Sequence, residues 1–297
     1  LFLLIFQSKP LESLVPIMGL FAVAAFRVMP SINRIVSATQ TLHYSYPALN
    51  VLYQEISSLE DKVFTQKEVK YLQLKDKLEV ENLYFRYDSK EKDALKDINL
   101  NIEFGSCIGI IGPSGSGKST LLDLLLGLLT PSKGLVKVNG IDIQKNLRGW
   151  QEQIGYVPQD IYLTDSSLRD NIAFGIDPEH ISEKKIEESI ISSSLNTFVD
   201  SLDEGLDTNI GERGVLLSGG QQQRIGIARA LYHDPEVLVF DEATSSLDIA
   251  IEKKIMDDVH NLTGIKTIVI VTHRLSTVSK CDYLYELKEG KIINQGS

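Results

Sequence analysis

Residues Gly112 to Thr120 read GPSGSGKST, which fits the phosphate-binding pattern G-x-x-x-x-G-K-[ST]. Before this loop, Ser106 to Ile111 (SCIGII) predicts a short buried strand, and after it Leu121 to Leu129 predicts a helix. A strand that leads through a glycine-rich loop into a helix N-terminus makes an anion site, because backbone N–H groups point inward and the helix dipole favours negative charge. All nine loop residues are therefore candidate phosphate contacts: Gly112, Pro113, Ser114, Gly115, Ser116, Gly117, Lys118, Ser119 and Thr120.

Two residues of this loop carry specific chemistry. Lys118 can reach the outer phosphates of a nucleotide, and the Ser119 hydroxyl can bind Mg²⁺. The glycines let the backbone approach the phosphates without a Cβ in the way. The alternative interpretation, a Gly/Ser-rich turn that carries a lysine by chance, loses weight as further motifs appear along the chain.

An acidic pair follows a second apolar strand. Val237 to Phe240 (VLVF) is typical of a central parallel strand, and Asp241 and Glu242 come directly after it. Ligands of open α/β sheets bind at the carboxyl ends of the strands. We expect Asp241 to hold Mg²⁺ opposite Ser119, and Glu242 to polarise a water for attack on the γ-phosphate. The alternative is an acidic strand end that faces solvent.

A second helix start resembles an anion site. Leu217 to Gln221 read LSGGQ, and Ser218, Gly219 and Gly220 open a helix. One nucleotide has one γ-phosphate, which the first loop already binds. We therefore expect this second site to serve a nucleotide bound elsewhere, for instance on a second copy of the chain. The alternative is an N-cap followed by flexible glycines.

Composition narrows the class of protein. The 297 residues carry a net charge of −10, which argues against a general nucleic-acid binder. The two cysteines, Cys107 and Cys281, make no disulfide framework and fit a reducing cytosol, with Cys107 a small core residue. The first residue is leucine and no signal peptide is visible, so we expect both ends of the sequence to be cut.

The N-terminal part leaves two interpretations open. Ser13 to Phe26 has no charge, and Arg27 and Arg34 follow. The run is shorter than a usual membrane span, so one interpretation is a buried helix. The other is that the chain begins with the end of one span, makes a tight turn and enters a second span whose inner half carries the two arginines. From Ile35 a seven-residue apolar repeat predicts a long helix, with a kink or junction at Pro47. The repeat comprises Ile35, Leu42, Leu49, Ile56 and Val63.

The remaining chain predicts an α/β domain with a mostly parallel sheet, because strands and helices alternate around the phosphate loop. Ile181 to Leu202 has helical spacing. Two hairpins are expected, one at Asn139-Gly140 and one near the C-terminus. The other expected strands are Leu83 to Tyr87, Ile98 to Phe104, Leu135 to Val138, Ile141 to Ile143, Ile154 to Val157, Thr267 to Val271, Tyr283 to Leu287 and Ile292 to Ile293.

Together these motifs resemble the ATP-binding cassette family, over about Leu78 to the C-terminus. They occur in the family's order: Tyr87, GPSGSGKST, Gln159 in VPQD, LSGGQ, Asp241-Glu242, SSLD at Ser245 to Asp248, and His273 in VTHRLS. The resemblance implies a P-loop NTPase with an antiparallel β-subdomain and a helical subdomain at about residues 160–233. It also implies ATP and Mg²⁺ as ligands. No cassette motif departs from the active pattern.

The resemblance also implies residue roles. Tyr87 would stack on adenine, whereas Tyr84 falls on the opposite strand face from Phe85 and Tyr87. Gln159 would touch Mg²⁺ and the attacking water and relay the nucleotide state to the membrane part. His273 would contact the γ-phosphate. Ser218, Gly219, Gly220 and Gln221 would contact an ATP held by a second copy of the chain.

The segment Thr208 to Gly214 (TNIGERG) resembles the one that marks exporters. This favours residues 1–75 as the end of a transmembrane domain, with a membrane helix at about 13–36 and its cytoplasmic extension to about Glu60, and residues 76–297 as the cassette. We therefore expect a multi-pass protein of the cell's inner membrane with its cassette in the cytoplasm. Its expected partners are membrane lipid and a transported substrate, and not nucleic acid. Phe26 to Ile35 is similar to flippases for lipid-linked oligosaccharides and to related polysaccharide exporters. Arg27 and Arg34 lie seven residues apart, near one face of a helix, so we expect them to contact the anionic head of such a substrate. The alternatives are a soluble cassette ATPase that acts on DNA or ribosomes, and arginines that only mark the membrane edge.

Overall fold

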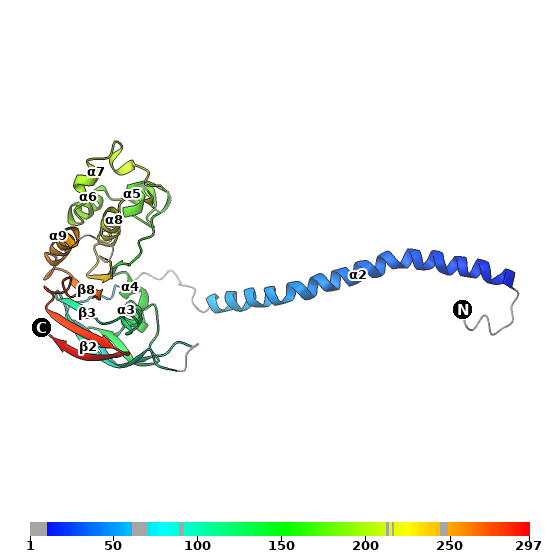
Figure 1. Ribbon diagram of the computed structural model, residues 1–297, viewed down its shortest axis with the longest axis horizontal. Coiled ribbons are helices and arrows are strands. Elements are labelled where there is room, and N and C mark those ends of the chain that lie inside the picture. The colour runs from blue at the N-terminus through cyan, green and yellow to red at the C-terminus, as the bar shows by residue number, and fades with distance from the viewer. Residues whose placement is uncertain (1–10, 61–70, 89–91, 212–213, 216, 244–248) are drawn as a thin grey trace. The chain divides into compact units, whose positions relative to one another are not determined.

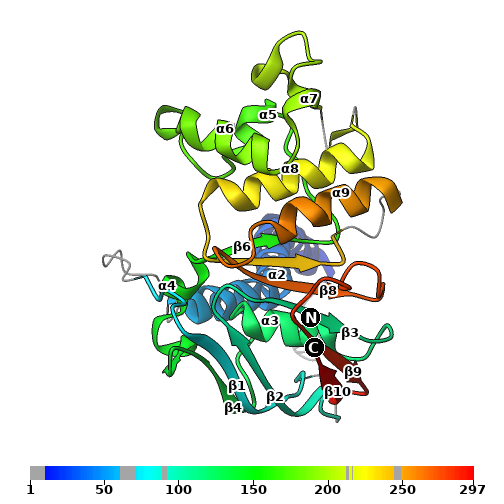
Figure 2. The ribbon, with the colours of Figure 1, turned by 90° about the vertical axis from the view of Figure 1, so that its left-hand side faces the viewer.

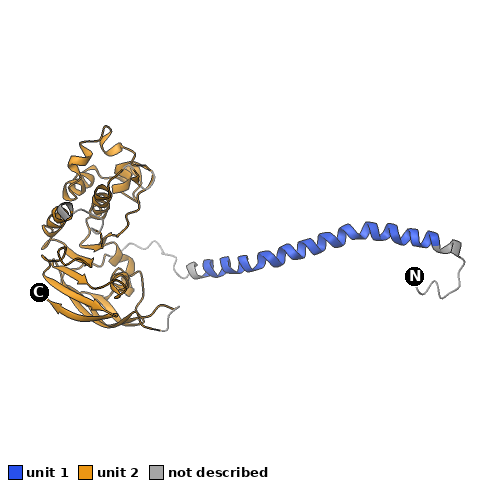
Figure 3. Ribbon diagram, viewed as in Figure 1, with its two compact units in different colours: residues 1–68 blue, residues 69–297 orange. Residues whose placement is uncertain are grey.

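The computed structural model describes residues 11–60, 71–88, 92–211, 214–215, 217–243 and 249–297. The chain divides into two compact units, residues 1–68 and 69–297 (Figure 3). The predicted domain boundary between residues 75 and 76 stays a prediction. The SSLD motif at 245–248 and the Glu212-Arg213 part of TNIGERG lie outside the described residues.

Within the first unit, the described residues form one helix, α2 (Leu11–Glu60). The helix runs through Pro16, Pro30 and Pro47 without interruption, so there is no junction at Pro47 (Figure 1). A proline removes one backbone hydrogen bond, and the neighbouring bonds keep the helix continuous. Four members of the seven-residue repeat, Ile35, Leu42, Leu49 and Ile56, are exposed in this unit, and Val63 lies outside the described residues. The segment Val15–Ser57 is long and apolar enough to cross a membrane by length and composition, with a mean hydropathy of 1.7 in its most apolar window.

A six-stranded sheet forms the centre of the second unit. Its order is β10-β9-β3-β8-β7-β6, and all neighbouring strands are parallel except the β9–β10 hairpin. The predicted mostly parallel sheet is therefore confirmed. The strands are β3 (Cys107–Ile111), β6 (Ile154–Val157), β7 (Val237–Asp241), β8 (Thr267–Thr272), β9 (Tyr283–Lys288) and β10 (Lys291–Gly296).

Both faces of this sheet are covered, as expected for parallel strands that are apolar throughout. Successive side chains of β7 point to opposite faces: Val237 and Val239 belong to one core cluster, and Leu238 and Phe240 to another. Helix α3 (Lys118–Leu125) contributes to the first cluster. Helices α8 (Gly219–Tyr232) and α9 (Ile249–His260) contribute to the second, and Figure 2 shows them on the other side of the sheet from α3.

A second sheet of four antiparallel strands packs against the α3 side through the same core cluster. Its order is β2-β1-β4-β5. The predicted turn at Asn139-Gly140 joins β4 to β5, and both residues have the positive φ angles, 49° and 79°, that such a tight turn requires. The strands are β1 (Lys77–Phe85), β2 (Leu95–Glu103), β4 (Lys133–Val138) and β5 (Ile141–Asp142). Ile143 begins a 3₁₀ helix instead of ending β5, so the strand predicted for 141–143 is one residue too long.

Two helix predictions need correction. The helix expected at Leu121 to Leu129 begins three residues earlier, at Lys118, and ends at Leu125, because Gly127 takes a left-handed φ of +71°. The helical segment expected at Ile181 to Leu202 is broken near Ser194, whose φ is +54°. That break separates α6 (Glu183–Ser192) from α7 (Asn196–Val199). The remaining elements are α4 (Leu147–Gln151), α5 (Leu168–Ile172) and the 3₁₀ helices η1 (Ile143–Asn146), η2 (Pro178–His180) and η3 (Gly205–Asp207).

Candidate nucleotide site

The glycine-rich loop connects β3 to α3 and packs tightly against the end of β9. A Cβ on Gly112 would lie 2.2 Å from the carbonyl oxygen of Leu287, so only glycine fits there. Gly117 caps α3 with a φ of +105° and supplies no side chain to the first helical amides. The loop therefore brings the N-terminus of α3, with amides that no side chain caps, to the carboxyl end of β3.

The inner wall of the loop is polar and buried. The Lys118 ammonium is almost fully buried and donates to the carbonyl oxygens of Gly112 and Pro113, at 3.0 and 3.1 Å. The buried Ser116 hydroxyl has no hydrogen-bond partner among the described residues. A buried hydroxyl normally finds a partner, so this loop has the unused polar capacity that suits a bound anion. Its residues therefore fit a nucleotide phosphate.

Glu242 lies at the centre of the charged cluster. Its backbone takes a left-handed φ of +48° and donates from its N–H to the carbonyl oxygen of Val271, at 2.8 Å. This conformation costs a non-glycine residue on the order of 1 kcal/mol or more. It places the carboxylate 3.9 Å from the Lys118 ammonium and 3.5 Å from Nδ1 of His273. The structure thus brings together three predicted site residues from three different segments of the chain.

Asp241 ends β7 in a partly buried position beside this cluster. Burial raises the pKa of its carboxyl group above the ordinary value, and the nearby carboxylates of Glu242 and Asp123 raise it further. The Tyr156 hydroxyl donates to Asp241 Oδ2 over a long 3.4 Å and partly offsets this shift. Burial, followed by Asp241, also raises the pKa of Tyr156 to about 12. A bound cation would stabilise the ionised form of the Asp241 carboxyl group and offset the free-energy cost of burying its negative charge. Asp241 is therefore suited to bind a metal ion.

Two residues of this group, Tyr156 and Asp123, were missed by sequence reasoning. Tyr156 lies on β6, which pairs in parallel with β7. Asp123 lies on α3 and has a pKa that burial raises. The available signal was a tyrosine in the otherwise apolar strand β6, and an aspartate within the apolar run of α3 that follows the phosphate loop. Their shared proximity to Asp241 depends on the strand order, which no local pattern encodes.

Tyr87 follows β1 and reaches the nucleotide loop. Its hydroxyl lies 3.1 Å from the Thr120 hydroxyl, and its ring contacts Phe85 edge-to-face, with centroids 4.8 Å apart. Tyr84 instead lies beside Lys133, whose ammonium is 6.0 Å from the ring centroid. Of the two tyrosines, Tyr87 is therefore the one that the structure connects to the phosphate loop.

The other predicted residues of this site are exposed. Within the loop these are Pro113, Ser114, Gly115 and Ser119. Gln159 follows β6 with an exposed side chain that makes no hydrogen bond to the part of the chain described. Such exposed positions are accessible to a ligand.

The LSGGQ residues lie at the N-terminus of α8. This helix packs with α5 and α6 in the helical part of the unit and not beside the phosphate loop (Figure 2). Ser218 caps the helix: its Oγ accepts from the Gln221 N–H at 3.3 Å, and Gln221 Oε1 accepts from the Ser218 N–H at 2.7 Å. The N-cap interpretation is therefore correct as local structure. Ser218 and Gly219 are exposed, which leaves this helix start accessible to a ligand as well.

In the first unit, Arg27 and Arg34 are both exposed on α2. They lie seven residues apart, which is close to two helical turns, so they share one side of the helix. No ion pair engages either arginine among the described residues.

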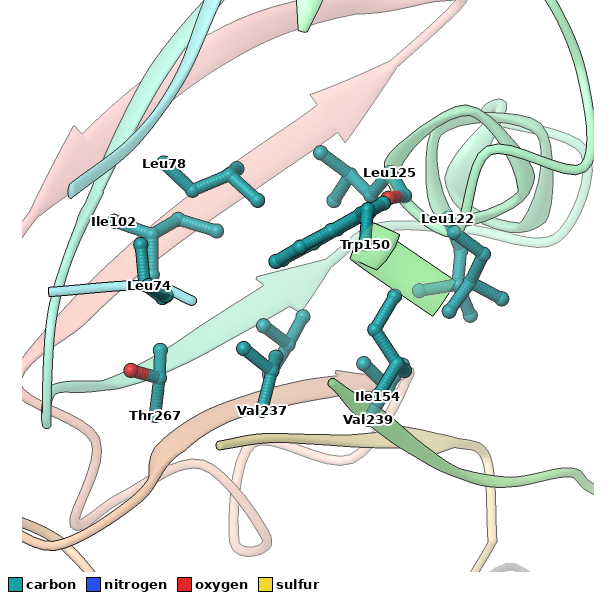
Figure 4. Close-up of a pocket in the computed structure, with 12 residues that line it drawn as sticks. Leu74, Leu78, Ile102, Leu122, Leu125, Trp150, Ile154, Val237, Val239 and Thr267 are labelled. Carbon is teal, nitrogen blue, oxygen red and sulfur yellow. The ribbon is translucent and has the colours of Figure 1, made fainter. Parts of the chain in front are cut away.

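Two hollows lined by described residues away from the phosphate loop do not suit a nucleotide. A small cavity of about 10 Å³ lies beside Trp150, and Figure 4 shows the mostly apolar side chains that line it. The Trp150 indole N–H donates to the Leu125 carbonyl at 2.8 Å, so this is a satisfied packing void with no room for a nucleotide. A larger hollow of about 670 Å³ lies between β2 and β9, where four carboxylates disfavour an anionic ligand. These are Glu79, Glu81, Glu103 and Asp282.

The strand, phosphate loop and helix, with an acidic pair at the end of β7, define a P-loop nucleotide-binding domain. The family model described as "ABC transporter" matches residues 95–245. This chain belongs to the ABC transporter family and carries its ATP-binding ATPase domain. The predicted family and fold class are thereby confirmed.

Related proteins agree with this assignment. The chain is 34% identical over 280 residues to an ATP-dependent lipid A-core flippase of Pseudomonas aeruginosa, covering 93% of this chain and 46% of the flippase. It is 42% identical over 225 residues to a toxin RTX-I translocation ATP-binding protein of Actinobacillus pleuropneumoniae, covering 75% of this chain and 32% of that protein. A bacterial Atm1-family ABC exporter solved with ATP bound superposes with a TM-score of 0.72 at 33% identity, covering 79% of this chain and 41% of the exporter. The chain thus spans less than half the length of each of these relatives.

Proposed function

We propose that this chain is part of an ATP-driven exporter or flippase of the cell's inner membrane, a multi-pass protein with its cassette in the cytoplasm. The observation that carries the proposal is the extent of the flippase match. Its 280 aligned residues exceed what residues 69–297 can supply, so the similarity continues into the unit that contains α2. That helix is also long and apolar enough to span a membrane.

In this proposal the loop from Gly112 to Thr120 binds the phosphates of ATP, and Tyr87 stacks on the adenine. Lys118 exchanges its contacts with the loop carbonyls for the outer phosphate oxygens, which requires only a local side-chain movement. Mg²⁺ would be held by Ser119, Gln159 and Asp241, and when bound it would neutralise charge on the phosphates. The Ser116 hydroxyl, which has no partner among the described residues, and the raised pKa of Asp241 both fit such ligands.

Glu242 acts as the general base in this proposal. It accepts a proton from the attacking water, while His273 orients toward the γ-phosphate. The proximity of His273 Nδ1 to Glu242 supports this pairing, because the base and its neighbour approach the same point from β7 and β8. The strained backbone of Glu242 keeps its carboxylate beside the loop.

The variant Glu242→Gln tests the catalytic assignment. It keeps the shape of the side chain and removes its basicity, so we expect ATP binding to persist while hydrolysis slows by roughly 10²–10⁴-fold. Steady-state phosphate release and binding of a fluorescent ATP analogue would be measured on the purified full-length protein. Turnover near that of the wild type would show that another group acts as the base.

We further propose that the transported substrate has an anionic head that contacts Arg27 and Arg34. A guanidinium in the bilayer costs about 2.5–3.5 kcal/mol on insertion scales, so the arginine-bearing side of α2 should line a wet cavity. Arginine suits phosphate oxygens, which a pyrophosphate-linked lipid would offer. The similarity to a protein named as a lipid A-core flippase supports a lipid-linked substrate class.

Double substitution of Arg27 and Arg34 by alanine tests this substrate contact in vesicles. We expect substrate movement to fall at least tenfold with basal ATP hydrolysis intact, because neither arginine belongs to the cassette. The matched control is Lys184→Ala, which removes an exposed charge from α6 within the cassette. Unchanged transport in the double variant would leave the arginines as markers of the membrane edge.

The alternative function, a soluble cassette ATPase that acts on nucleic acid or ribosomes, is separable by fractionation. The proposed exporter requires detergent for extraction, whereas the alternative predicts release from membranes by high salt. Full solubility in salt alone would overturn the membrane proposal without affecting the assignment of the cassette.

A further inference from the structure

The chain's two cysteines meet at the amino-terminal edge of the sheet, at the end of β3 that lies away from the phosphate loop. Cys107 is the first residue of β3, and Cys281 comes two residues before β9. Their sulfur atoms lie 3.0 Å apart, closer than ordinary van der Waals contact. Both residues are free thiols.

Backbone hydrogen bonds hold this pair in place. The Asp282 N–H donates to the Cys107 carbonyl at 2.8 Å, and the Cys107 N–H donates to Asp282 Oδ2, also at 2.8 Å. The Cys281 N–H donates to the Val278 carbonyl at 3.0 Å. The main chain on both sides of the pair is therefore anchored, so the short sulfur separation follows from the fold.

The two thiols differ in accessibility. Cys107 is fully buried in the core cluster beneath α9, whereas Cys281 is partly exposed. The hydrogen bond to Cys281, together with burial, raises the pKa of Cys107 well above the ordinary value, so its thiol stays protonated at neutral pH. A small oxidant in solution therefore reacts first with Cys281, and the buried Cys107 thiol is then in position to react with the oxidised sulfur.

We propose that Cys107 and Cys281 form an oxidisable dithiol site, which a hydroperoxide converts into an intramolecular disulfide. The peroxide transfers one oxygen to the Cys281 sulfur, giving a sulfenic acid and one water. The Cys107 sulfur then attacks the Cys281 sulfur while the proton of its thiol passes to the departing hydroxyl, so the S–O bond breaks, the S–S bond forms and the hydroxyl leaves as a second water. Both thiols lose their hydrogens, and one hydrogen peroxide is reduced to two waters. A cellular dithiol such as thioredoxin would reverse the bond.

The position of the site predicts what the disulfide does. It joins residues 174 positions apart in sequence, so it restricts the unfolded chain strongly. In the folded state it joins segments that backbone bonds already hold, and β3 pairs directly with β9. The phosphate loop begins at the other end of β3, at Gly112, and neither cysteine is among the described contacts of Gly112, Gly117 or Lys118. The disulfide should therefore stabilise the cassette against unfolding and leave ATP hydrolysis active.

The test treats the full-length protein, purified in detergent under reducing conditions, with hydrogen peroxide. Peptide mapping by mass spectrometry without reductant should find one linked peptide pair that contains Cys107 and Cys281, two hydrogens lighter than the separate peptides. The unfolding midpoint of the cassette should rise by roughly 5–10 °C, as expected for closing so long a loop, and dithiothreitol should reverse both changes. ATP hydrolysis should stay within about twofold of the reduced protein, a difference below 0.5 kcal/mol in activation free energy.

Cys281→Ser is the matched control, because its partly exposed position tolerates a hydroxyl better than the buried site of Cys107. This variant should form no linked peptide and should show no rise in midpoint with peroxide. The proposal is overturned if the wild type accumulates sulfenic or sulfinic acid on Cys281 without the linked pair, or if linkage forms only between two chains. Cys107→Ala provides a second control, since it removes the resolving thiol and should leave Cys281 as sulfenic acid.

Discussion

At the scale of single residues, the candidate site combines backbone strain with an unfavourably placed charge. Glu242 has a left-handed φ of +48°, and Asp241 before it has a pKa that burial raises. Both features destabilise the ligand-free fold, and both lie next to the loop lysine. Sites built for a charged ligand commonly carry such costs, since the ligand offsets them when it binds.

The charge cost at Asp241 can be measured with Asp241→Asn. Because its pKa is raised in the folded state, Asp241 stabilises the fold when protonated, and this contribution is lost as pH rises through the folded-state pKa. We therefore expect Asp241→Asn to be more stable than the wild type at pH 7 without ligand. The difference should vanish below the ordinary carboxyl pKa of 3.8, where the wild type is protonated in both states.

Urea unfolding of both proteins at pH 7 and near pH 3.5, without nucleotide or Mg²⁺, measures this difference. Comparing the two proteins at each pH cancels the titration of the other carboxyl groups. In the same variant ATP hydrolysis should fall by roughly 10²-fold or more, because the metal loses an anionic ligand. A variant less stable than the wild type at pH 7 would show that the charge of Asp241 is compensated within the fold.

At the scale of elements, one arginine adds polar contacts to the apolar packing between α8 and α5. The Arg229 guanidinium donates to the carbonyl oxygens of Asn171 and Tyr162, at 2.8 and 2.9 Å, and to Asn171 Oδ1 at 3.2 Å. Its planar group also lies 4.7 Å from the Phe174 ring centroid. Burial lowers the pKa of Arg229, and no acidic partner in the described part of the chain offsets this shift, so the carbonyl groups and the Phe174 ring compensate for the desolvation of its charge. The arginine thereby connects α8, which begins with LSGGQ, to the segment that follows β6.

Substituting Arg229 by lysine should disrupt this connection. An ammonium cannot reproduce the planar fork and the ring contact, and each lost bond to a charged group costs roughly 1.5–3 kcal/mol. We expect a loss of about 2–3 kcal/mol in the free energy of unfolding, together with faster amide hydrogen exchange in α5. The matched control, Arg224→Lys on the same helix, alters one carbonyl bond, to Ser194, and should cost less than half as much. If the two variants lost equal free energy of unfolding, the apolar core and not the Arg229 contacts would stabilise the packing of α8 against α5.

At the scale of the whole molecule, the two helix starts that suit anions belong to different parts of the cassette. The phosphate loop joins the sheet to α3, whereas the Ser218 cap belongs to the helical part with α5 and α6. Both have exposed residues available to ligands. A pair of cassettes arranged head to tail would let each ATP use a loop from one copy and a helix start from the other.

Mixing Lys118→Ala chains with Ser218→Arg chains tests this dimer. In a mixed dimer one shared site carries both defects and the other is intact, so ATP hydrolysis should partly recover, up to roughly half of the wild-type rate per mixed dimer. Each variant alone should be nearly inactive. ATP hydrolysis that stays monomeric at every protein concentration would rule out the shared site.

The sequence by itself determined the phosphate loop, the acidic pair after β7, the strands of the parallel sheet and the family resemblance. These depend on local rules: glycine spacing, apolar runs and turn chemistry at positions such as Asn139-Gly140. Tertiary structure decided where the α3 helix begins and ends, because packing of Gly112 and Gly127 sets the limits of the loop and helix. Only tertiary structure also brought Glu242 to His273, Tyr156 to Asp241, and Cys107 to Cys281. Each of these pairs joins separate segments, and their proximity follows from the order and register of strands, which long-range packing selects.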